Sequence, residues 1–473
     1  MNVTAQTRFD PAAVSSFQFT YRRLEADGTV RLGYALDEIS FEEVYKLPAP
    51  AVDSPATDAL LSLLHWVAGV SYFKAAVPQK LVCETGAPPP AAGRLLAALY
   101  SEGLGEFTVV NGLEKLPHPQ FPRGIEPPAA GPDALGSAGS PDPASVTEPA
   151  SVLHPSGVRR PASLLVPVGG GKDSAVAIEI ARASGLQTQL FSVNDAKPIR
   201  ETTRVSGFAR HMVTRRIDPA LIELNARGAL NGHVPVTAIV SCVALLCAAT
   251  QGLDAVALAN ERSASAGNFS WHGVEVNHQF SKSRRAELLL ADAVAEIAGA
   301  PLIFSVLRPA SELVIARAFA GMPAYHPVFT SCNRVFRIDP AKRAGSWCCD
   351  CDKCRFVFLI LAPFMTPAQL TEIFGRDLLD DPLHYPGFAL LTATGGEKPF
   401  ECVGEVEECL AAITLLAANP AWRDHAVVKE LAREVLTRQA PLSEAQISVI
   451  FSLSEDHSIP EPLAGAVHEV LRA

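Results

Sequence analysis

The chain has 473 residues, of which 48% are hydrophobic and 19% are charged, and its formal net charge is −10. This length and composition suit two or three domains with buried cores, and they exclude a disordered or fibrous protein. The acidic balance excludes a broad basic surface, so we expect no nucleic-acid partner, although a local basic pocket for a small anion remains compatible with it.

The sequence carries no clear export or membrane signal. Its first ten residues lack a basic segment followed by an apolar core, so we expect no secretory signal and a cytoplasmic location. The stretch 234–253 has no charged residue, but it contains a proline and several hydroxyl side chains. A buried helix explains this stretch better than a membrane span.

Residues 1–116 are predicted to form an α+β lobe. Apolar and polar residues alternate over 17–37 around an Asp-Gly turn, which predicts a β-hairpin. Helical periodicity predicts helices within 60–76 and 94–100, and the run at 107–110 is expected to be a strand. These patterns assign the lobe no chemistry.

Residues 117–161 differ from the rest, because eleven of the chain's 37 prolines fall within them. No periodic apolar pattern survives there, so we expect an extended linker. The apolar run 164–168 that follows is typical of a buried parallel strand, and 175–184 is typical of a helix. We therefore expect an α/β domain over 162–330.

A glycine-rich loop joins this strand to this helix. Glycines can take positive φ and turn their amides toward one point, where the positive end of the helix dipole also lies, so the loop is typical of a phosphate site. Neither the Walker A spacing nor the dinucleotide fingerprint is present. An ordinary βα turn is the alternative. The predicted nucleotide-binding residues of the loop are Gly169, Gly170, Gly171, Lys172, Asp173 and Ser174.

The loop resembles that of the PP-loop ATP pyrophosphatases, whose general form is SGGxDS. This resemblance implies that the loop amides and Ser174 hold pyrophosphate, while the α-phosphorus of ATP stays open to attack by a substrate oxygen. Asp173 is expected to orient the loop or to meet Mg²⁺, because a bare carboxylate beside phosphates would be repelled.

Alternating strands and helices after the loop predict a doubly wound fold with one parallel, five-stranded sheet. In such a sheet, ligands collect beyond the carboxyl ends of the strands. The remaining strands are expected at 187–194, 211–216, 255–260 and 302–307, and the helices at 199–208, 236–251, 283–298 and 311–320.

Polar side chains follow three of these predicted strands. Asn194, Arg262 and Arg308 are candidates for nucleotide contacts, and the two arginines suit them best because a guanidinium binds phosphate bidentately. Each of these polar groups can instead form a turn or a helix cap, and Ser311 suits the N-cap of its helix.

Residues 331–365 are expected to form a cysteine-rich knuckle followed by an apolar helix. Clustered cysteines in a chain without an export signal favour a metal over disulfides, with free thiols or a redox pair as the alternatives. Cys349 leaves the ligand set ambiguous. The spacing resembles the zinc site of 7-cyano-7-deazaguanine synthase, also a PP-loop enzyme. The predicted ligands of a structural Zn²⁺ are Cys332, Cys348, Cys351 and Cys354.

Residues 366–473 are predicted to form a helical region. Such a region most simply serves packing, but the segment 398–404 can instead reach the active site. Amphipathic helices are expected at 406–418, 425–437, 443–454 and 461–471.

Motifs that stand out along nearly the whole chain include Leu32-Gly-Tyr-Ala-Leu36, Gly103-Leu-Gly-Glu-Phe107, Asn231-Gly-His-Val-Pro-Val-Thr237, Val276-Asn-His-Gln-Phe-Ser-Lys282 and Lys398-Pro-Phe-Glu-Cys402. They resemble those of the UDP-N-acetylmuramoyl-L-alanyl-L-glutamate epimerase family. This resemblance implies an ATP- and Mg²⁺-dependent isomerase of peptidoglycan precursor synthesis. The enzyme would invert the terminal L-Glu of UDP-MurNAc-L-Ala-L-Glu through an acyl-adenylate and release AMP and pyrophosphate. We expect the N-terminal lobe to help to hold the UDP and the sugar.

Inversion through this route needs one group that removes the α-proton and another that returns a proton to the opposite face. His233, His278, Lys282 and Cys332 are the candidates, although structural histidines are common. We favour His233 and Lys282, since Cys332 in this role would leave the zinc one ligand short. Two other functions stay open: another AMP-forming PP-loop synthetase that makes an amide or a nitrile or modifies tRNA, and a non-catalytic nucleotide-binding regulator. The oligomeric state is not determined by these patterns.

Overall fold

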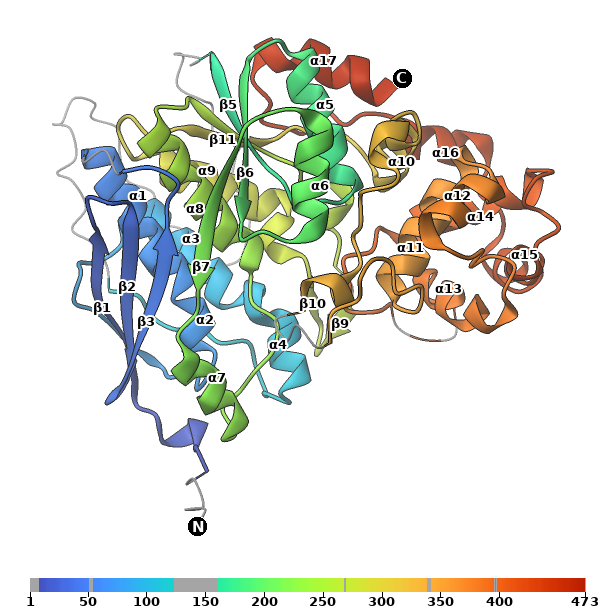
Figure 1. The fold of residues 1–473 in the computed structure, drawn as a ribbon. Coiled ribbons are helices and arrows are strands. Elements are labelled where there is room, and N and C mark those ends of the chain that lie inside the picture. Colours follow the sequence, from blue (N-terminus) through green and yellow to red (C-terminus); the bar gives the residue numbers. More distant parts are fainter. Residues whose placement is uncertain are drawn as a thin grey trace, which may run out of the picture.

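The computed structural model describes residues 8–50, 54–122, 160–267, 269–337, 342–394, 396 and 398–472. A large, mostly parallel β-sheet lies at its centre, and the C-terminal region is a group of helices beside the sheet (Figure 1). The predicted α/β class and the helical C-terminal region are confirmed. Most of the predicted linker 117–161 lies outside the described residues.

Nine strands of the described chain form one sheet, and five neighbouring strands run parallel as predicted. Leu164 and Val166 of the central strand pack into one hydrophobic cluster, and Leu165 packs into another, because successive side chains of a strand point to opposite faces. Both faces are therefore buried under helices. The order across the sheet is β11 (Leu302–Ser305), β8 (Ala255–Leu258), β5 (Ser163–Pro167), β6 (Gln187–Val193), β7 (Arg210–Arg216), β3 (Ile39–Lys46), β2 (Thr29–Leu36), β1 (Ser16–Leu24) and β4 (Lys80–Cys83).

The strands of the N-terminal lobe continue this sheet instead of forming a separate one. β3 pairs antiparallel with β7, and β1 and β2 form the predicted hairpin. A buried ion pair between Arg215 and Glu43, with 2.6 Å between Nε and Oε1, crosses the junction. The N-terminal lobe is therefore joined to the parallel strands by both backbone and side-chain contacts.

Helices cover both faces of the sheet. The uncharged stretch forms α8 (Val236–Gln251), which is buried as predicted and packs against α1 (Pro55–Ala68). On the other face α5 (Lys172–Ala183) packs against α10 (Glu312–Ala320). Within the described ranges, the structure has no helix that combines the length and the apolar character needed to cross a bilayer. The other helices beside the sheet are α2 (Val70–Phe73), α3 (Pro90–Tyr100), α4 (Gly105–Val110), α6 (Lys197–Ser206), α7 (Pro219–Ala226) and α9 (Arg284–Ala295).

Two local predictions for the N-terminal lobe differ from the structure. The strand expected at 107–110 is wrong, because these residues belong to helix α4. Phe107 and Thr108 are both fully buried in this helix, and the Thr108 hydroxyl donates to the Leu104 carbonyl one turn earlier, over 2.9 Å. The helix expected within 60–76 is divided into α1 and α2 at Gly69, where an added Cβ would lie 2.5 Å from the Phe19 ring.

The C-terminal helices share a core with the sheet. The hydrophobic cluster that contains Leu164 and Val166 also contains the fully buried Trp422. The last helix, α17 (Glu461–Arg472), returns to pack against α5 and α10, as its red ribbon beside the green α5 shows (Figure 1). The remaining helices are α11 (Asp352–Leu361), α12 (Pro367–Phe374), α13 (Tyr385–Leu391), α14 (Val406–Ala418), α15 (Ala426–Gln439) and α16 (Glu444–Phe451).

Candidate active site

A cavity of about 470 Å³ lies where the sequence predicts ligands to collect. The chain runs from β5 to β6 and β7 on one side and then to β8 and β11 on the other, so the strand order reverses between β5 and β8. Such a reversal leaves a crevice at the carboxyl ends of the strands. The polar side chains that line the cavity include Asp173, Ser174, Asn260, Lys282, Lys353 and Cys402.

The glycine-rich loop forms one wall of this cavity. The Gly169 amide donates to the Ser174 hydroxyl over 2.9 Å, which folds the loop back onto the first turn of α5. Gly170 has a φ of 83°, and an added Cβ would lie 2.6 Å from the Pro198 backbone carbon. An added Cβ on Gly171 would lie 2.5 Å from the hydroxyl oxygen of a neighbouring serine. The positive φ and the backbone contact therefore require glycine at 170, whereas a side chain at 171 would have to displace the Ser331 hydroxyl.

Lys172 lies beneath the loop and not in the cavity wall. Its side chain is 1% exposed, and its ammonium group binds the carboxylates of Asp173 and Glu312. Burial opposes the charged form, but these two carboxylates raise the pKa of Lys172 well above its usual value. Burial also acts on Asp173, yet Lys172 holds the Asp173 pKa below its usual range. Lys172 therefore stays charged and fixes Asp173 at the cavity wall.

Two further lysines line the cavity. Lys282 ends the short 3₁₀ helix η4 (Phe280–Lys282), and Lys353 in the first turn of α11 donates to the carbonyl of Cys402. Burial would lower the pKa of Lys282, but the neighbouring Cys402 and carboxylates raise it above the usual lysine value. Both ammonium groups lie near Asp173. The cavity therefore offers two cationic groups to an anionic ligand and one carboxylate to a cation that such a ligand binds.

A carboxylate and both predicted histidines gather beside the cavity. Nδ1 of His278 is hydrogen-bonded to Glu106 of α4, and Nδ1 of His233 lies 3.6 Å from the same carboxylate oxygen. Burial lowers the pKa of His233 to about 4. The pKa of His278 is instead raised to about 9, because hydrogen bonds to Cys402 and Glu106 outweigh its burial. His278 is therefore the protonated histidine of this pair at neutral pH.

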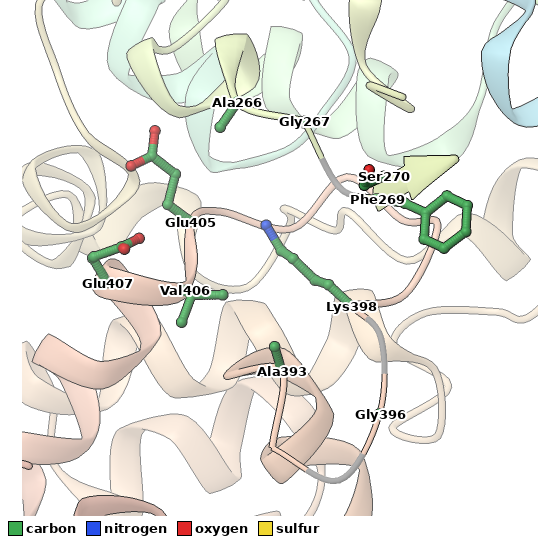
Figure 2. A pocket seen from close by; sticks show the side chains of 10 residues that line it. All are labelled: Ala266, Gly267, Phe269, Ser270, Ala393, Gly396, Lys398, Glu405, Val406 and Glu407. Atoms are coloured by element: carbon green, nitrogen blue, oxygen red, sulfur yellow. The ribbon is translucent and has the colours of Figure 1, made fainter. Parts of the chain in front are cut away.

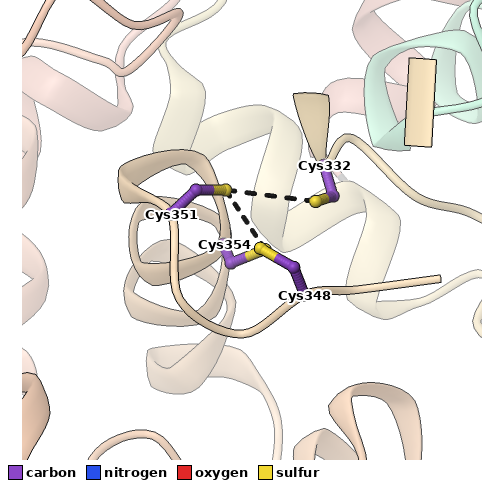
Figure 3. Close-up of side chains that lie close together, drawn as sticks. All are labelled: Cys332, Cys348, Cys351 and Cys354. Atoms are coloured by element: carbon purple, nitrogen blue, oxygen red, sulfur yellow. Dashed lines mark hydrogen bonds between the residues drawn. The ribbon is translucent and has the colours of Figure 1, made fainter. Parts of the chain in front are cut away.

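The four cysteines of the predicted zinc site lie together at the start of α11 (Figure 3). Sulfur–sulfur distances are 4.0 Å for Cys332 and Cys351, 3.7 Å for Cys348 and Cys354, and 3.5 Å for Cys351 and Cys354. Four thiols gathered within 4.8 Å of one another can enclose a tetrahedral metal ion. Cys349 turns away, has a φ of 57° and donates its thiol to a backbone carbonyl, so it is separate from the other four.

The residues that line the cavity and the four clustered cysteines fall within matches to one protein family. The family model of the MurL N-terminal domain matches residues 8–306, and that of the MurL C-terminal domain matches residues 328–446. The chain belongs to the MurL family. The cavity combines both matched parts of this MurL chain, since Asp173, Ser174 and Lys282 come from the first and Lys353 and Cys402 from the second.

Three curated MurL relatives, each named UDP-N-acetyl-α-D-muramoyl-L-alanyl-L-glutamate epimerase, are similar to nearly the whole chain. The relative from a Micromonospora species is 44% identical over 462 residues, which cover 93% of this chain and 95% of the relative. The Salinispora tropica relative is 43% identical over 441 residues, with coverages of 90% and 88%. The Xanthomonas oryzae pv. oryzae relative is 38% identical over 463 residues, with coverages of 96% and 97%. No solved structure matches the chain significantly.

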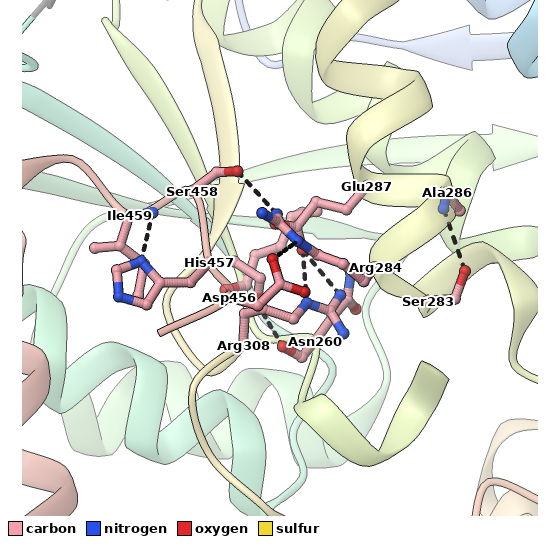
Figure 4. Close-up of polar contacts among 12 residues, drawn as sticks. Asn260, Ser283, Arg284, Ala286, Glu287, Arg308, Asp456, His457, Ser458 and Ile459 are labelled. Atoms are coloured by element: carbon pink, nitrogen blue, oxygen red, sulfur yellow. Dashed lines mark hydrogen bonds and ion pairs between the residues drawn. The ribbon is translucent and has the colours of Figure 1, made fainter. Parts of the chain in front are cut away.

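Arg308 of this MurL chain does not line the first cavity. Its side chain is 2% exposed, and its guanidinium donates to Glu287 Oε2 over 2.8 and 3.0 Å (Figure 4). The same guanidinium donates to the backbone carbonyl of Lys282 over 2.6 Å. Glu287 also accepts from Arg284, which in turn binds Asp456 ahead of α17. Arg308 therefore holds the Lys282 turn, and its guanidinium is occupied by protein partners.

Arg262 and Asn194 also do not line the first cavity, and both are hydrogen-bonded to other groups of the chain. Arg262 donates to the backbone carbonyls of Ile450 and Ser452 at the end of α16. Asn194 has a φ of 61°, and its side-chain oxygen accepts from the Arg215 amide over 3.0 Å. The alternative of a helix cap is confirmed for Ser311, which caps α10.

A second cavity, of about 510 Å³, touches the same C-terminal segment as the first. Its lining includes Phe269 and Ser270 of the hairpin β9 (Phe269–Trp271) and β10 (Val274–Val276), together with Lys398 and Glu405 (Figure 2). Cys402, which lies between Lys398 and Glu405 in the chain, lines the first cavity. The segment 398–404, which was predicted to be able to reach the active site, therefore contributes to the lining of both cavities.

Sequence reasoning did not select four residues of this site. Glu106 and Cys402 lie within motifs that carry the MurL resemblance, so a signal was present, but no role followed from it. Lys353 lies between the predicted metal ligands Cys351 and Cys354 in the chain, and we predicted no role for it from the sequence. Glu312 follows the N-cap of α10 and meets Lys172 only through the tertiary fold.

Proposed function

We propose that this chain is an ATP- and Mg²⁺-dependent epimerase that inverts the terminal L-Glu of UDP-MurNAc-L-Ala-L-Glu through an acyl-adenylate. The names of the relatives support the overall reaction. The observation that carries the ATP step is the glycine-rich loop of PP-loop form, which borders a cavity with two lysines and Asp173. Loop amides at the start of a helix and buried ammonium groups favour polyphosphate binding.

In the proposed reaction, a substrate carboxylate oxygen attacks the α-phosphorus of ATP. The bond between the α-phosphorus and the bridging oxygen breaks, and pyrophosphate leaves toward the loop amides and Ser174. Lys282 and Lys353 offset the negative charge in the cavity. Asp173 is the residue that would hold Mg²⁺, which balances phosphate charge when it is bound.

Adenylation makes the inversion chemically accessible. A free carboxylate resists loss of the α-proton, because the product would carry two adjacent negative charges. The mixed anhydride has no carboxylate charge, so the electron pair left at Cα is delocalised into its carbonyl group. One protein group removes the α-proton, and a second returns a proton to the opposite face. Water then cleaves the mixed anhydride and releases AMP.

We further propose roles for the four-cysteine cluster and for the second cavity. The four-cysteine cluster suits a Zn²⁺ that would tie Cys332 to the start of α11 and so hold Lys353 at the cavity wall. The second cavity suits the nucleotide sugar of the substrate, because it shares the segment around Cys402 with the first cavity. None of its lining residues belongs to the N-terminal lobe, so this proposal replaces the role that the sequence suggested for that lobe.

The experiment that tests this function uses the purified chain with ATP, Mg²⁺ and UDP-MurNAc-L-Ala-L-Glu in deuterated water. We expect AMP, pyrophosphate, D-Glu at the peptide terminus and deuterium at its Cα. Ser174→Ala should abolish AMP formation, whereas Ser184→Ala, at the far end of α5, should leave it unchanged. A need for ammonia or a sulfur donor would indicate a synthetase instead, and ATP binding without pyrophosphate release would indicate a regulator.

A further inference from the structure

Cys402 occupies a defined position in the wall of the first cavity. It lies outside any helix or strand, in the segment between α13 and α14, yet its backbone is held in place. Lys353 donates to its carbonyl, and the preceding Glu401 accepts from Asn333. Cys402 therefore lines the same cavity as Asp173 and the glycine-rich loop, on an anchored backbone.

The surroundings of the thiol are those of an acid–base group. His278 makes a side-chain hydrogen bond to Cys402, and its Nδ1 is bonded to Glu106. The ammonium groups of Lys282 and Lys353 also act on the thiol. Burial alone would raise the Cys402 pKa, but these three cationic groups lower it to about 7. A substantial fraction of Cys402 is then thiolate at neutral pH.

Other cysteines outside the four-cysteine cluster behave differently. Cys242 and Cys247 lie inside α8, where burial among apolar side chains raises the pKa of each to about 12. Burial likewise raises the pKa of Cys83 in β4 to about 12. These three cysteines are inert packing residues, whereas Cys402 combines a cavity with a hydrogen-bonded histidine and two lysines.

We propose that Cys402 is one of the two proton-transfer residues of the epimerase, with His278 and Lys282 holding its thiolate in position. This proposal rests on the proposed function, because it takes the activated glutamyl group as the substrate of the step. The thiolate accepts the α-hydrogen as a proton and an S–H bond forms. The C–H electron pair passes into the activated carbonyl group. The second residue supplies a proton to the opposite face of Cα, which completes the inversion.

The test uses Cys402→Ser and Cys402→Ala, with Cys83→Ser as the matched control. Each variant is given ATP, Mg²⁺ and either the L-Glu or the D-Glu form of the substrate in deuterated water. We expect inversion to fall by about 10²- to 10⁴-fold in both Cys402 variants, the usual contribution of a general acid–base group. AMP formation should persist, and Cα exchange should be lost with one isomer and retained with the other. Loss of a structural residue would instead reduce AMP formation and both exchange reactions together, and that result would overturn the proposal.

A second measurement does not depend on turnover. Alkylation of Cys402 by iodoacetamide, followed by mass spectrometry of its peptide, should show a midpoint near pH 7 and protection by the substrate. A midpoint at the ordinary thiol value of 9.0 would contradict the proposal. If the unmodified chain inverts glutamate without forming AMP, the proposed adenylation fails, while the isomer-specific exchange still tests Cys402.

Discussion

Removing the charge of Lys172 is expected to destabilise the fold, and the size and pH dependence of the effect follow from its surroundings. Lys172→Met keeps most of the side-chain volume but leaves the carboxylate of Glu312, which is 2% exposed, without its cationic partner. Breaking a buried ion pair in this way costs about 3–5 kcal/mol of unfolding free energy. Arg204→Met is the matched control, because its ion pair with Glu201 is largely exposed and should contribute about 1 kcal/mol or less.

The deficit should also depend on pH with a defined sign. Burial already raises the pKa of Glu312 in the native protein, and loss of Lys172 removes the main group that opposes this shift. A carboxyl group with a raised native pKa contributes stability below its unfolded pKa and loses it as the pH rises through the native pKa. The destabilisation of Lys172→Met should therefore grow from pH 5 to pH 8, by at most about 1.4 kcal/mol per pH unit.

Urea unfolding of the native chain, Lys172→Met, Arg204→Met and the double variant Lys172→Met/Glu312→Leu measures this effect. The double variant should recover most of the loss, because replacing both partners of a buried pair by apolar side chains is often neutral. A loss within about 1 kcal/mol for Lys172→Met at both pH values would refute the reasoning, since this is the range of an exposed ion pair.

Four further predictions concern the site. Gly170→Ala should abolish AMP formation, because it adds a Cβ beside Pro198 at a φ of 83°; a variant with normal AMP release would refute the role given to the loop. Arg308→Met should destabilise the fold by about 1–3 kcal/mol in urea unfolding, because Glu287 keeps only its ion pair with Arg284 and the Lys282 carbonyl loses its donor, and an unchanged midpoint would contradict this. Cys348→Ser should remove about one zinc per chain by metal analysis, whereas Cys349→Ser should retain it; equal metal contents would argue against the four-cysteine site. Inversion at saturating substrate should fall about tenfold per pH unit below pH 7, because protonation of Cys402 removes the thiolate, and a rate that stays constant down to pH 5 would exclude this role.

Local patterns predicted the elements around the cavity well where residues were strongly periodic. The helix at 236–251 matches α8 at both ends, because Pro235 and Gly252 delimit an uncharged and mostly apolar stretch. The strand prediction for 107–110 was wrong. β-branched residues favour strands locally, but Phe107 and Thr108 are buried in the tertiary structure as part of a helix. That helix carries Glu106, so the same error concealed the partner of His278.

The sequence by itself determined the glycine-rich loop, the individual strands beside it and the cysteine cluster, since each depends on residues close together in the chain. Only the tertiary structure decided which charges meet. Lys172 and Glu312 are 140 residues apart, and His278 and Glu106 are 172 apart. Arg308 has the composition of a phosphate ligand, but the fold encloses it beside Glu287. Burial and long-range pairing control the charge state of such groups, and neither is encoded in local spacing.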